Sequence, residues 1–465
     1  MQASPIPTGY QLTWRSCFFD VLTLVVKWGG CEAKSHRDSA CGYTADLSRP
    51  CFPPSSLWHC AWDGAFQLAN CGDLILKTIA IQLERGVVEG RVATGFEPVA
   101  LAFADNFTNH QEVGAACALY YRGHPVVDIW GGLADVGSGS AWQEDTICLV
   151  FSAAKGPTAT CIHQLAEAGR LDIDLPIAHY WPEFGCNGKE SITTRLVLTH
   201  SAGLAAVDGD LTLEQVLAWE PVVAAIAAQA PNWEPGTQHG YHARSFGWIL
   251  GELIRRITGE SPGAYLARHI AAPLGLRYWV GLPESELACC ATLVQPEGGS
   301  DAVAELLGAD SLTARVMSGP SGLFGYNAMW NRPDVLAAEM PSSNGVGDAR
   351  SLARLYSGLI AEVDGVRLLG QEQLAKACEQ QVRGADAVIF HETCFGLGYG
   401  LQPTLAPGAG PNSFGHPGAG GALAFADPDA QLGFAYVMNA MHFNAEGDPR
   451  TIGLVRAAYE CLEAI

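Results

Sequence analysis

The sequence predicts an α+β fold in which an antiparallel β-sheet is flanked by N- and C-terminal helices and carries a largely helical insertion. Three observations predict it. Strand pairs with tight turns occur near residues 114–130 and 422–439, helical periodicity dominates residues 194–280, and a helix is expected from about 449 to 464. Because a strand pair stands on each side of the helical middle, we expect both parts of the chain to build one sheet.

Each expected element follows from a local pattern. Helices are expected where apolar residues recur every three or four positions, and strands where short apolar runs end at turn residues. The expected helices are 96–107, 152–168, 246–258, 349–362 and 449–464. The expected strands are 114–121, 125–130, 422–427 and 433–439. Residues 284–345 are punctuated by Gly, Ser and Pro, which predicts loops that form a pocket wall.

Composition disfavours several classes of function. The chain has 465 residues, of which 48% are hydrophobic and 16% charged, as in a folded globular protein. Its net charge of −21 disfavours binding to nucleic acid or to an anionic membrane surface. No apolar run reaches the roughly 18 residues that span a bilayer. We therefore expect a cytoplasmic protein, without membrane insertion, that acts on a small molecule.

The first 85 residues differ from the rest. They show no sustained period of 2 or 3.6 residues, and they hold six of the fifteen cysteines. We expect residues 1–87 to be an extension outside the fold. One hypothesis is an over-extended reading frame with the true start at Val87 or Val88, since no methionine occurs between Met1 and Met317. The expected domain is 88–465, with a sheet part at about 88–150 and 346–465 and a helical part at about 151–345.

The most informative motif is Ser152-Ala-Ala-Lys155. It places a hydroxyl and an amine one helical turn apart, on one face of the helix that is expected there. A serine needs an adjacent proton acceptor to act as a nucleophile, and a lysine can serve once burial and neighbouring groups lower its pKa. Because such a pair also arises by chance, the motif gains weight only from its companions.

Two further motifs follow along the chain. Tyr241 precedes an expected helix, and a phenol near a lysine ammonium can ionise below its usual pKa of about 10 and act as a base. An ordinary, partly buried tyrosine is the alternative. The segment from His416 through Gly418 to Gly421 leads into an expected strand, where glycine lets the backbone approach a ligand closely. With the N–H of the nucleophile, this edge can form an oxyanion hole, although a plain Gly-rich turn looks the same.

In their order and spacing these three motifs resemble those of the serine β-lactamase and penicillin-binding-protein superfamily. Within it, the chain looks most like the carboxylesterases related to class C β-lactamases. The resemblance covers roughly residues 88–465. It extends to the segments Leu198-Thr-His-Ser-Ala-Gly-Leu204, Pro273-Leu-Gly-Leu276, Ser343-Asn-Gly-Val-Gly347, Phe395-Gly-Leu-Gly-Tyr399 and Phe425-Ala-Asp-Pro428.

The resemblance implies a role for each motif. Ser152 would be the acylated nucleophile, Lys155 its proton acceptor, and Tyr241 the group that protonates the leaving group and activates the deacylating water. The backbone N–H groups of Ser152 and Ala419 would form the oxyanion hole. The reaction would be acyl transfer through an acyl-enzyme, without a cofactor. The residues expected to contact the substrate are His416, Gly418 and His242.

Departures from the superfamily's pattern favour an esterase. In β-lactamases and penicillin-binding proteins the third motif is Lys-Thr-Gly, whose cation helps to hold a carboxylate, whereas here it is His416-Pro-Gly. A histidine is mostly neutral at pH 7. The last position of the tyrosine motif is Ala243 in place of an asparagine. We therefore expect hydrolysis of small, neutral carboxylic esters with short acyl chains. Pro157, within the nucleophile helix, predicts a local kink.

Other interpretations remain open from the sequence. A β-lactamase, a D-amino peptidase or an acyltransferase would use the same motifs, and a non-catalytic binding protein could share the fold. His239 and His242 have H-x-x-H spacing, but no third ligand is evident, so no metal is expected. His200 is expected to order the loop at 198–204 rather than to react. The absence of a G-x-S-x-G motif counts against an α/β-hydrolase.

Overall fold

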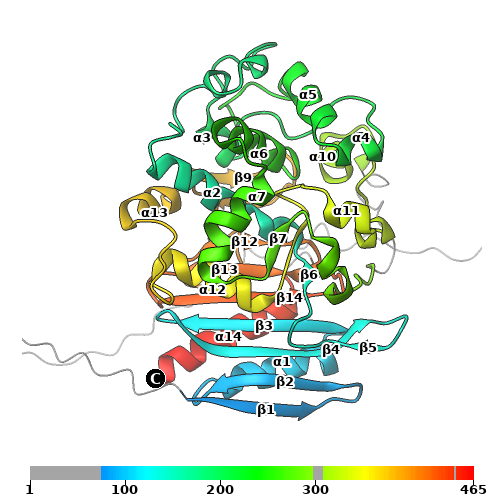
Figure 1. The fold of residues 1–465 in the computed structure, drawn as a ribbon, viewed down its shortest axis with the longest axis vertical. Helices are drawn as coiled ribbons and strands as arrows, with labels where there is room; N and C mark the ends of the chain where they lie inside the picture. The colour runs from blue at the N-terminus through cyan, green and yellow to red at the C-terminus, as the bar shows by residue number, and fades with distance from the viewer. Residues whose placement is uncertain (1–74, 297–306, 445–446) are drawn as a thin grey trace, which may run out of the picture. The chain divides into compact units, whose positions relative to one another are not determined.

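The computed structural model describes residues 75–296, 307–444 and 447–465, and most of the expected extension lies outside them. The predicted fold class is confirmed. An antiparallel sheet carries α1 (Glu97–Asn109) and α14 (Pro449–Ala464) on one face, and a largely helical part lies on the other (Figure 1). The first and last helices of the described part therefore flank the sheet, as the sequence predicted, and they share one core.

The large sheet has eleven strands, all paired antiparallel. In spatial order they are β1 (Leu76–Gln82), β2 (Val87–Ala93), β4 (His124–Asp135), β3 (Gly114–Tyr121), β14 (Leu432–Met438), β13 (Leu423–Asp427), β12 (Phe414–Pro417), β11 (Gly400–Leu401), β10 (Glu392–Phe395) and β9 (Val382–Ala385), with β5 (Ser140–Ala141) beside β4. A second sheet has the order β6 (Cys148–Leu149), β8 (Gly345–Gly347) and β7 (Tyr278–Val280).

The remaining α-helices of the described residues lie between β6 and β9 in the sequence. They are α2 (Lys155–Glu167), α3 (Thr194–Leu198), α4 (Leu213–Leu217), α5 (Glu220–Ala228), α6 (Ser245–Thr258), α7 (Pro262–Leu266), α8 (Ala272–Leu274), α10 (Leu312–Ser318), α11 (Pro333–Ala337), α12 (Ala349–Ile360) and α13 (Gln371–Cys378). Every helix and strand that the sequence predicted is present, with ends shifted by a few residues. The expected loops at 284–345 also hold α10, α11 and β8, whereas residues 297–306 lie outside the described part.

Strand β3 shows how the large sheet separates two hydrophobic cores. Because side chains alternate along a strand, its odd-numbered and even-numbered residues face opposite ways. Ala115, Cys117 and Leu119 belong to the core under α1 and α14, whereas Ala116 and Ala118 belong to the core that contains α2, α6 and α12. Phe151 and Ala153 belong to this second core, whereas Tyr241 belongs to a smaller, third cluster.

The sheet begins earlier than the sequence analysis expected. Strand β1 pairs with β2 over seven residues, from Leu76 opposite Ala93 to Gln82 opposite Val87. The boundary expected at residue 88 is therefore wrong, and a chain that started at Val87 or Val88 would lack its edge strand. The signal was weak because no residue of β1 is fully buried and its seven residues do not alternate regularly between apolar and polar.

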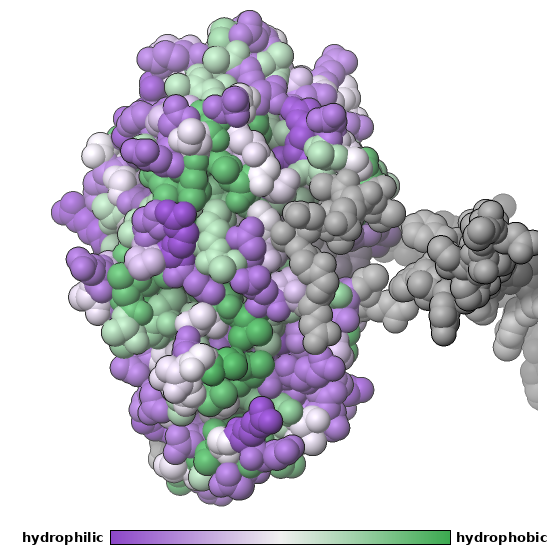
Figure 2. Space-filling view, turned by 90° about the vertical axis from the view of Figure 1, so that its right-hand side faces the viewer, coloured by the Kyte–Doolittle hydropathy of each residue, from purple (hydrophilic) through white to green (hydrophobic). Residues whose placement is uncertain are grey.

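The surface combines polar and apolar residues. Figure 2 shows polar residues over much of one face, with apolar residues gathered in smaller patches between them. Within the described ranges, no helix combines the length and the apolar character needed to cross a membrane.

Candidate active site

Ser152 lies in a single 3-10 turn, Phe151–Ala154, that runs directly into α2. The residue before it, Phe151, has a φ of 47°, in the left-handed region that bulky residues rarely adopt. Its ring packs edge-on against Trp330 and Tyr326, with centroids 5.0 and 5.7 Å away. Packing thus holds a strained backbone at the residue that precedes the candidate nucleophile, and such strain is common at functional sites.

Pro157 does not interrupt the nucleophile helix. Helix α2 begins at Lys155 and continues to Glu167, which places Pro157 in its first turn. Proline is tolerated there because its fixed φ suits the start of a helix. The expected kink is therefore not observed, and the spacing of Ser152 and Lys155 is that of one continuous turn.

The structure brings Ser152, Lys155 and Tyr241 together. The Tyr241 hydroxyl donates a hydrogen bond to Ser152 Oγ at 2.7 Å. Lys155 Nζ lies 3.3 Å from the same oxygen and 4.7 Å from the centroid of the Tyr241 ring. The serine oxygen therefore has a phenol on one side and an amine on the other.

Lys155 is fully buried and is held by backbone carbonyls. Its Nζ donates to Ala243 O at 2.7 Å and to Ser342 O at 3.1 Å. Burial, and secondly the charge of Arg244, hold the pKa of Lys155 well below its usual value. Among the described residues, none of the ion pairs involves Lys155. A lowered pKa is what a lysine needs in order to take a proton from a neighbouring hydroxyl.

Tyr241 behaves differently from the expectation of an ionised phenol. Burial raises its pKa, and the hydrogen bond with Ser152 offsets this only in part. The reason is that a buried phenolate loses the hydration that would stabilise its charge. In the free protein Tyr241 is thus protonated.

The third motif lies directly beside the nucleophile. It occupies the end of β12 and a short turn, Ala419–Gly421. A Cβ atom at Gly418 would overlap the carbonyl oxygen of Val150, so only glycine allows this close approach. Within the described part of the chain, the backbone N–H groups of Ser152 and Ala419 have no hydrogen-bond acceptor. Two donors near the nucleophile are therefore free for a ligand.

His416 is buried and neutral. Its Nδ1 lies 2.7 Å from Pro417 O, its Nε2 has no hydrogen-bond partner in the described structure, and its ring lies 5.9 Å from that of Tyr241. Burial, reinforced by Lys155, lowers the pKa of His416 to about 3. Its expected contact with a substrate, and that of Gly418, stay predictions.

The hydrogen bonds of His242 are made with the protein itself, and its expected contact with a substrate stays a prediction. It is fully buried, its Nε2 accepts from the Leu204 N–H at 3.1 Å, and its Nδ1 lies 2.7 Å from Gly240 O. The His242 N–H donates to His200 Nδ1, also at 3.1 Å. Both histidines therefore order the loop around residues 198–204, as the sequence predicted for His200.

The other member of the H-x-x-H pair is equally engaged. His239 Nε2 lies 3.0 Å from Thr393 Oγ1, on β10. Over the ranges that the structure covers, no three His, Cys, Asp or Glu residues are grouped so that they could hold a metal ion.

A narrow pocket opens beside the nucleophile, with a volume of about 20 Å³. It is lined by Phe151, Ser152, Tyr241, Ala243, Arg244, Met317, Tyr326, Trp330, Ser343 and Ala419. This volume is close to what one water molecule needs. The lining comes from segments far apart in the sequence and includes the loop-rich region that was expected to form a wall.

Arg244 is the site residue that the sequence analysis missed. Its Nη1 donates to Val316 O and Met317 O, at 3.0 and 2.9 Å, and its Nη2 donates to Phe324 O at 3.0 Å. Burial lowers its pKa to about 10, so it stays charged at neutral pH. Its only local signal was its place three residues after Tyr241, because its partners lie more than 70 residues away.

Comparison with known proteins identifies the family of the chain. The profile of the family described as Beta-lactamase matches residues 92–458. The esterase/beta-lactamase LipL of Mycobacterium tuberculosis is 34% identical over 366 residues, which make up 76% of this chain and 83% of LipL.

Solved structures give the same result. A family VIII carboxylesterase is 37% identical with a TM-score of 0.71, over 80% of this chain and 99% of that one. EstA from Arthrobacter nitroguajacolicus Rue61a is 33% identical with a TM-score of 0.73, over 80% and 98%. The chain therefore belongs to the beta-lactamase family and is a serine hydrolase, as its motifs predicted.

Proposed function

We propose that the protein hydrolyses small, neutral carboxylic esters with short acyl chains, through an acyl-enzyme on Ser152. The observation that carries the proposal is the position of Ser152 Oγ between the Tyr241 hydroxyl and Lys155 Nζ, at 2.7 and 3.3 Å. A nucleophile needs a base within hydrogen-bond reach, and the leaving group needs an acid. This site offers one of each.

Lys155 is the base. A neutral lysine has two N–H donors and one lone pair, and both donors are directed to carbonyls, those of Ala243 and Ser342. The lone pair is then left for the Ser152 hydroxyl proton. Because Ser152 Oγ already accepts from Tyr241, its own proton is free to point at Lys155.

The acylation step uses all three groups. Ser152 Oγ attacks the ester carbonyl carbon as its proton moves to Lys155, which gives a tetrahedral intermediate with a negative oxygen. The N–H groups of Ser152 and Ala419, which lack acceptors in the described structure, donate to that oxygen. When the C–O bond breaks, Tyr241 donates its proton to the departing alkoxide, and the proton on Lys155 restores the phenol.

Deacylation runs through the same groups in reverse. A water molecule takes the place of the departed alcohol and attacks the acyl carbon, while Tyr241 takes a proton from the water and passes its own proton to Lys155. When the second tetrahedral intermediate collapses, Lys155 returns that proton to Ser152 Oγ and the carboxylic acid leaves. No step needs a cofactor.

The walls of the site favour a small, neutral substrate. The narrow pocket leaves little room for a long acyl chain. His416 is neutral, and Ala243 offers only a methyl group, so neither side chain provides a cation to hold a carboxylate. Arg244 is charged, but three of its N–H bonds are directed to the carbonyls of residues 316, 317 and 324.

The test is hydrolysis of p-nitrophenyl acetate, butyrate and octanoate by the protein and by Ser152→Ala, together with labelling by a fluorophosphonate. We expect turnover that falls with chain length, and loss of both turnover and labelling in the variant. A variant that keeps its labelling and its rate would show that another residue is the nucleophile. Equal rates for all three esters would contradict the preference for short chains.

Hydrolysis of β-lactams is the second candidate. It is favoured by the similarity to LipL, a protein that is named both esterase and beta-lactamase. The neutral His416 argues for weak recognition of the β-lactam carboxylate. A chromogenic cephalosporin tests this: we expect its kcat/KM to be at least about 100-fold below that for p-nitrophenyl acetate, in line with a loss of about 3 kcal/mol of charge-assisted bonding.

A further inference from the structure

The turn that carries Ala419 is held from outside the pocket. Arg450 Nη2 donates to the carbonyl oxygen of Gly420 at 2.6 Å, and the same oxygen accepts from the His442 N–H at 3.0 Å. Gly421 lies so close that a Cβ atom there would collide with the Arg450 guanidinium and with Asp448. The turn therefore packs directly against the Arg450 side chain.

Every donor of this guanidinium is occupied. Nη1 donates to Glu112 Oε2 at 2.9 Å and to Ala440 O at 2.8 Å. Nε donates to Asp448 Oδ1 at 3.0 Å, and Nη2 donates to Asp448 Oδ2 at 2.7 Å as well as to Gly420 O. An arginine has five N–H bonds, and all five have an acceptor. The side chain is thus fixed in one orientation.

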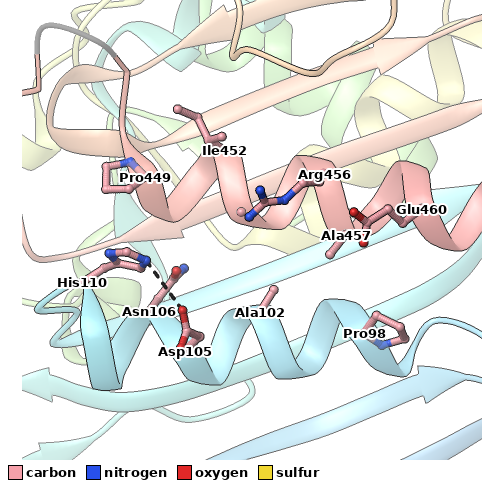
Figure 3. A pocket seen from close by; sticks show the side chains of 11 residues that line it. Pro98, Ala102, Asp105, Asn106, His110, Pro449, Ile452, Arg456, Ala457 and Glu460 are labelled. Carbon is pink, nitrogen blue, oxygen red and sulfur yellow. Dashed lines mark ion pairs between the residues drawn. The ribbon is translucent and has the colours of Figure 1, made fainter.

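The network is dry and joins elements that are distant in the sequence. The side chains of Arg450 and Glu112 are both 0% exposed, and the Tyr436 hydroxyl donates to the same Glu112 oxygen. Glu112 follows α1, and Arg450 is in the first turn of α14. Figure 3 shows these two helix ends side by side, where His110 lies next to Pro449.

The sheet brings this network to the site. The C-terminal end of β14 lies beside the N-terminal ends of its neighbours β3 and β13. Met438 is opposite Ala115 on β3, and Tyr436 is opposite Leu423 on β13. Strand β12 also ends there, since Pro417 is opposite Leu423. The residues that follow or precede these strand ends include Gly420, Ala440 and Glu112.

We propose that Arg450 is a positioning residue, which fixes the Ala419–Gly421 turn so that the Ala419 N–H is directed at the oxyanion of the reaction. The proposal rests on the proposed function. Buried ion pairs contribute little net stability compared with apolar packing, but they hold one geometry. An oxyanion donor depends on geometry above all, because it must sit within hydrogen-bond distance of the developing charge.

Three variants of the full chain test the proposal: Arg450→Met, Arg450→Lys and Arg456→Met. Lysine keeps a positive charge for Glu112 and Asp448, but its single nitrogen cannot also reach Gly420 as the broad guanidinium does. Arg456 is the matched control, because it lies on the same helix but is exposed, in the surface groove between α1 and α14 (Figure 3).

Reactive sites are first counted by titration with a fluorophosphonate, so that unfolded protein does not count. We expect kcat for p-nitrophenyl acetate, per titrated site, to fall about 100-fold in Arg450→Met and about 10-fold in Arg450→Lys, with KM within about twofold. Phenylboronic acid forms a tetrahedral adduct with the serine that places an oxygen in the oxyanion hole, so its inhibition constant should rise by a similar factor. Arg456→Met should match the wild type in all three quantities.

Arg450→Lys decides the question if Arg450→Met does not fold. A folded Arg450→Lys protein with wild-type kcat and boronate affinity would overturn the proposal. So would a loss of kcat that leaves the boronate affinity unchanged, since that indicates a general structural role. Failure of the proposed function would be recognised by Ser152→Ala, which would then retain esterase activity. That result does not depend on the Arg450 variants.

Discussion

The Tyr241 hydroxyl and Ser152 Oγ lie 2.7 Å apart, although the two residues are separated by 89 positions in the sequence. The phenol donates, because burial raises its pKa and keeps it protonated. In the proposed mechanism Lys155 takes the serine proton and Tyr241 protonates the leaving group. Each of these proposed roles can be tested.

Tyr241→Phe removes the proton donor and keeps the ring. We expect kcat for p-nitrophenyl acetate to fall by about 100-fold to 10,000-fold, the usual range for the loss of an acid–base group. Because p-nitrophenolate leaves without help from an acid, the loss should be greater for ethyl acetate. Equal losses for the two esters, measured by steady-state kinetics, would contradict the role of Tyr241 as the acid.

The pH dependence should report on Lys155 and Arg244. Lys155 acts only when unprotonated, so activity is lost as the pH falls through its lowered pKa. Arg244→Gln removes the neighbouring positive charge, which raises the pKa of Lys155 and moves the acid limb of kcat/KM to higher pH. Arg244→Lys keeps the charge and should leave the limb in place. The profile is measured from about pH 5 to pH 10, and a limb that does not move in Arg244→Gln argues against the electrostatic role.

Stability should depend on pH through the same lysine. The folded-state pKa of Lys155 lies well below the unfolded value of about 10.4, so between the two the unfolded chain binds a proton that the folded chain does not. The free energy of unfolding therefore falls as the pH falls through this window. In Lys155→Met this dependence disappears. The free energy of unfolding of the variant, relative to that of the wild type, should therefore rise as the pH falls below about 10. Urea unfolding at a series of pH values measures the difference in the free energy of unfolding between the two proteins. A difference that does not change with pH would refute the prediction.

Gly418→Ala should damage the site without a change of charge. The φ of Gly418 is −107°, which alanine tolerates, so the cost comes only from the overlap of its Cβ with Val150 O. We expect kcat to fall at least about 100-fold and the stability to fall by about 1–3 kcal/mol. Gly453→Ala in α14 is the control. No atom lies within 4 Å of its Cβ position, so it should stabilise the helix by about 1 kcal/mol at full activity. Calorimetry and kinetics distinguish the two.

The edge strand offers a test of the domain boundary. A chain that begins at Val87 lacks β1, whose Leu76, Ile79 and Ile81 pack against the core under α1 and α14. Compared with a chain that begins at Ala69, it should lose about 2–4 kcal/mol of stability, because partly buried apolar side chains contribute about 1 kcal/mol each. It should also aggregate more readily, since β2 becomes an unprotected edge. Equal unfolding temperatures for the two chains would show that β1 adds nothing.

Much of the fold follows from local sequence patterns. The helix at 449–464 and the strand pair at 114–130 were predictable, because apolar periodicity and turn residues depend on near neighbours in the chain. The pairing of Ser152 with Lys155 was predictable for the same reason, since a spacing of three places two side chains on one face of any helix. The family resemblance added Tyr241 and Ala419. Both are so far from Ser152 in the sequence that their spacing alone does not say where they lie in the structure.

The tertiary structure alone decided the electrostatics of the site. Only the packed protein shows that Lys155 is buried with a lowered pKa, that Tyr241 donates to Ser152, and that His242 accepts a hydrogen bond from the backbone of Leu204. Arg450 could not be connected with the turn at Gly420 from its place in the chain. Pattern and spacing determine elements, whereas burial, pKa and the satisfaction of each donor depend on contacts between segments that are far apart in the sequence.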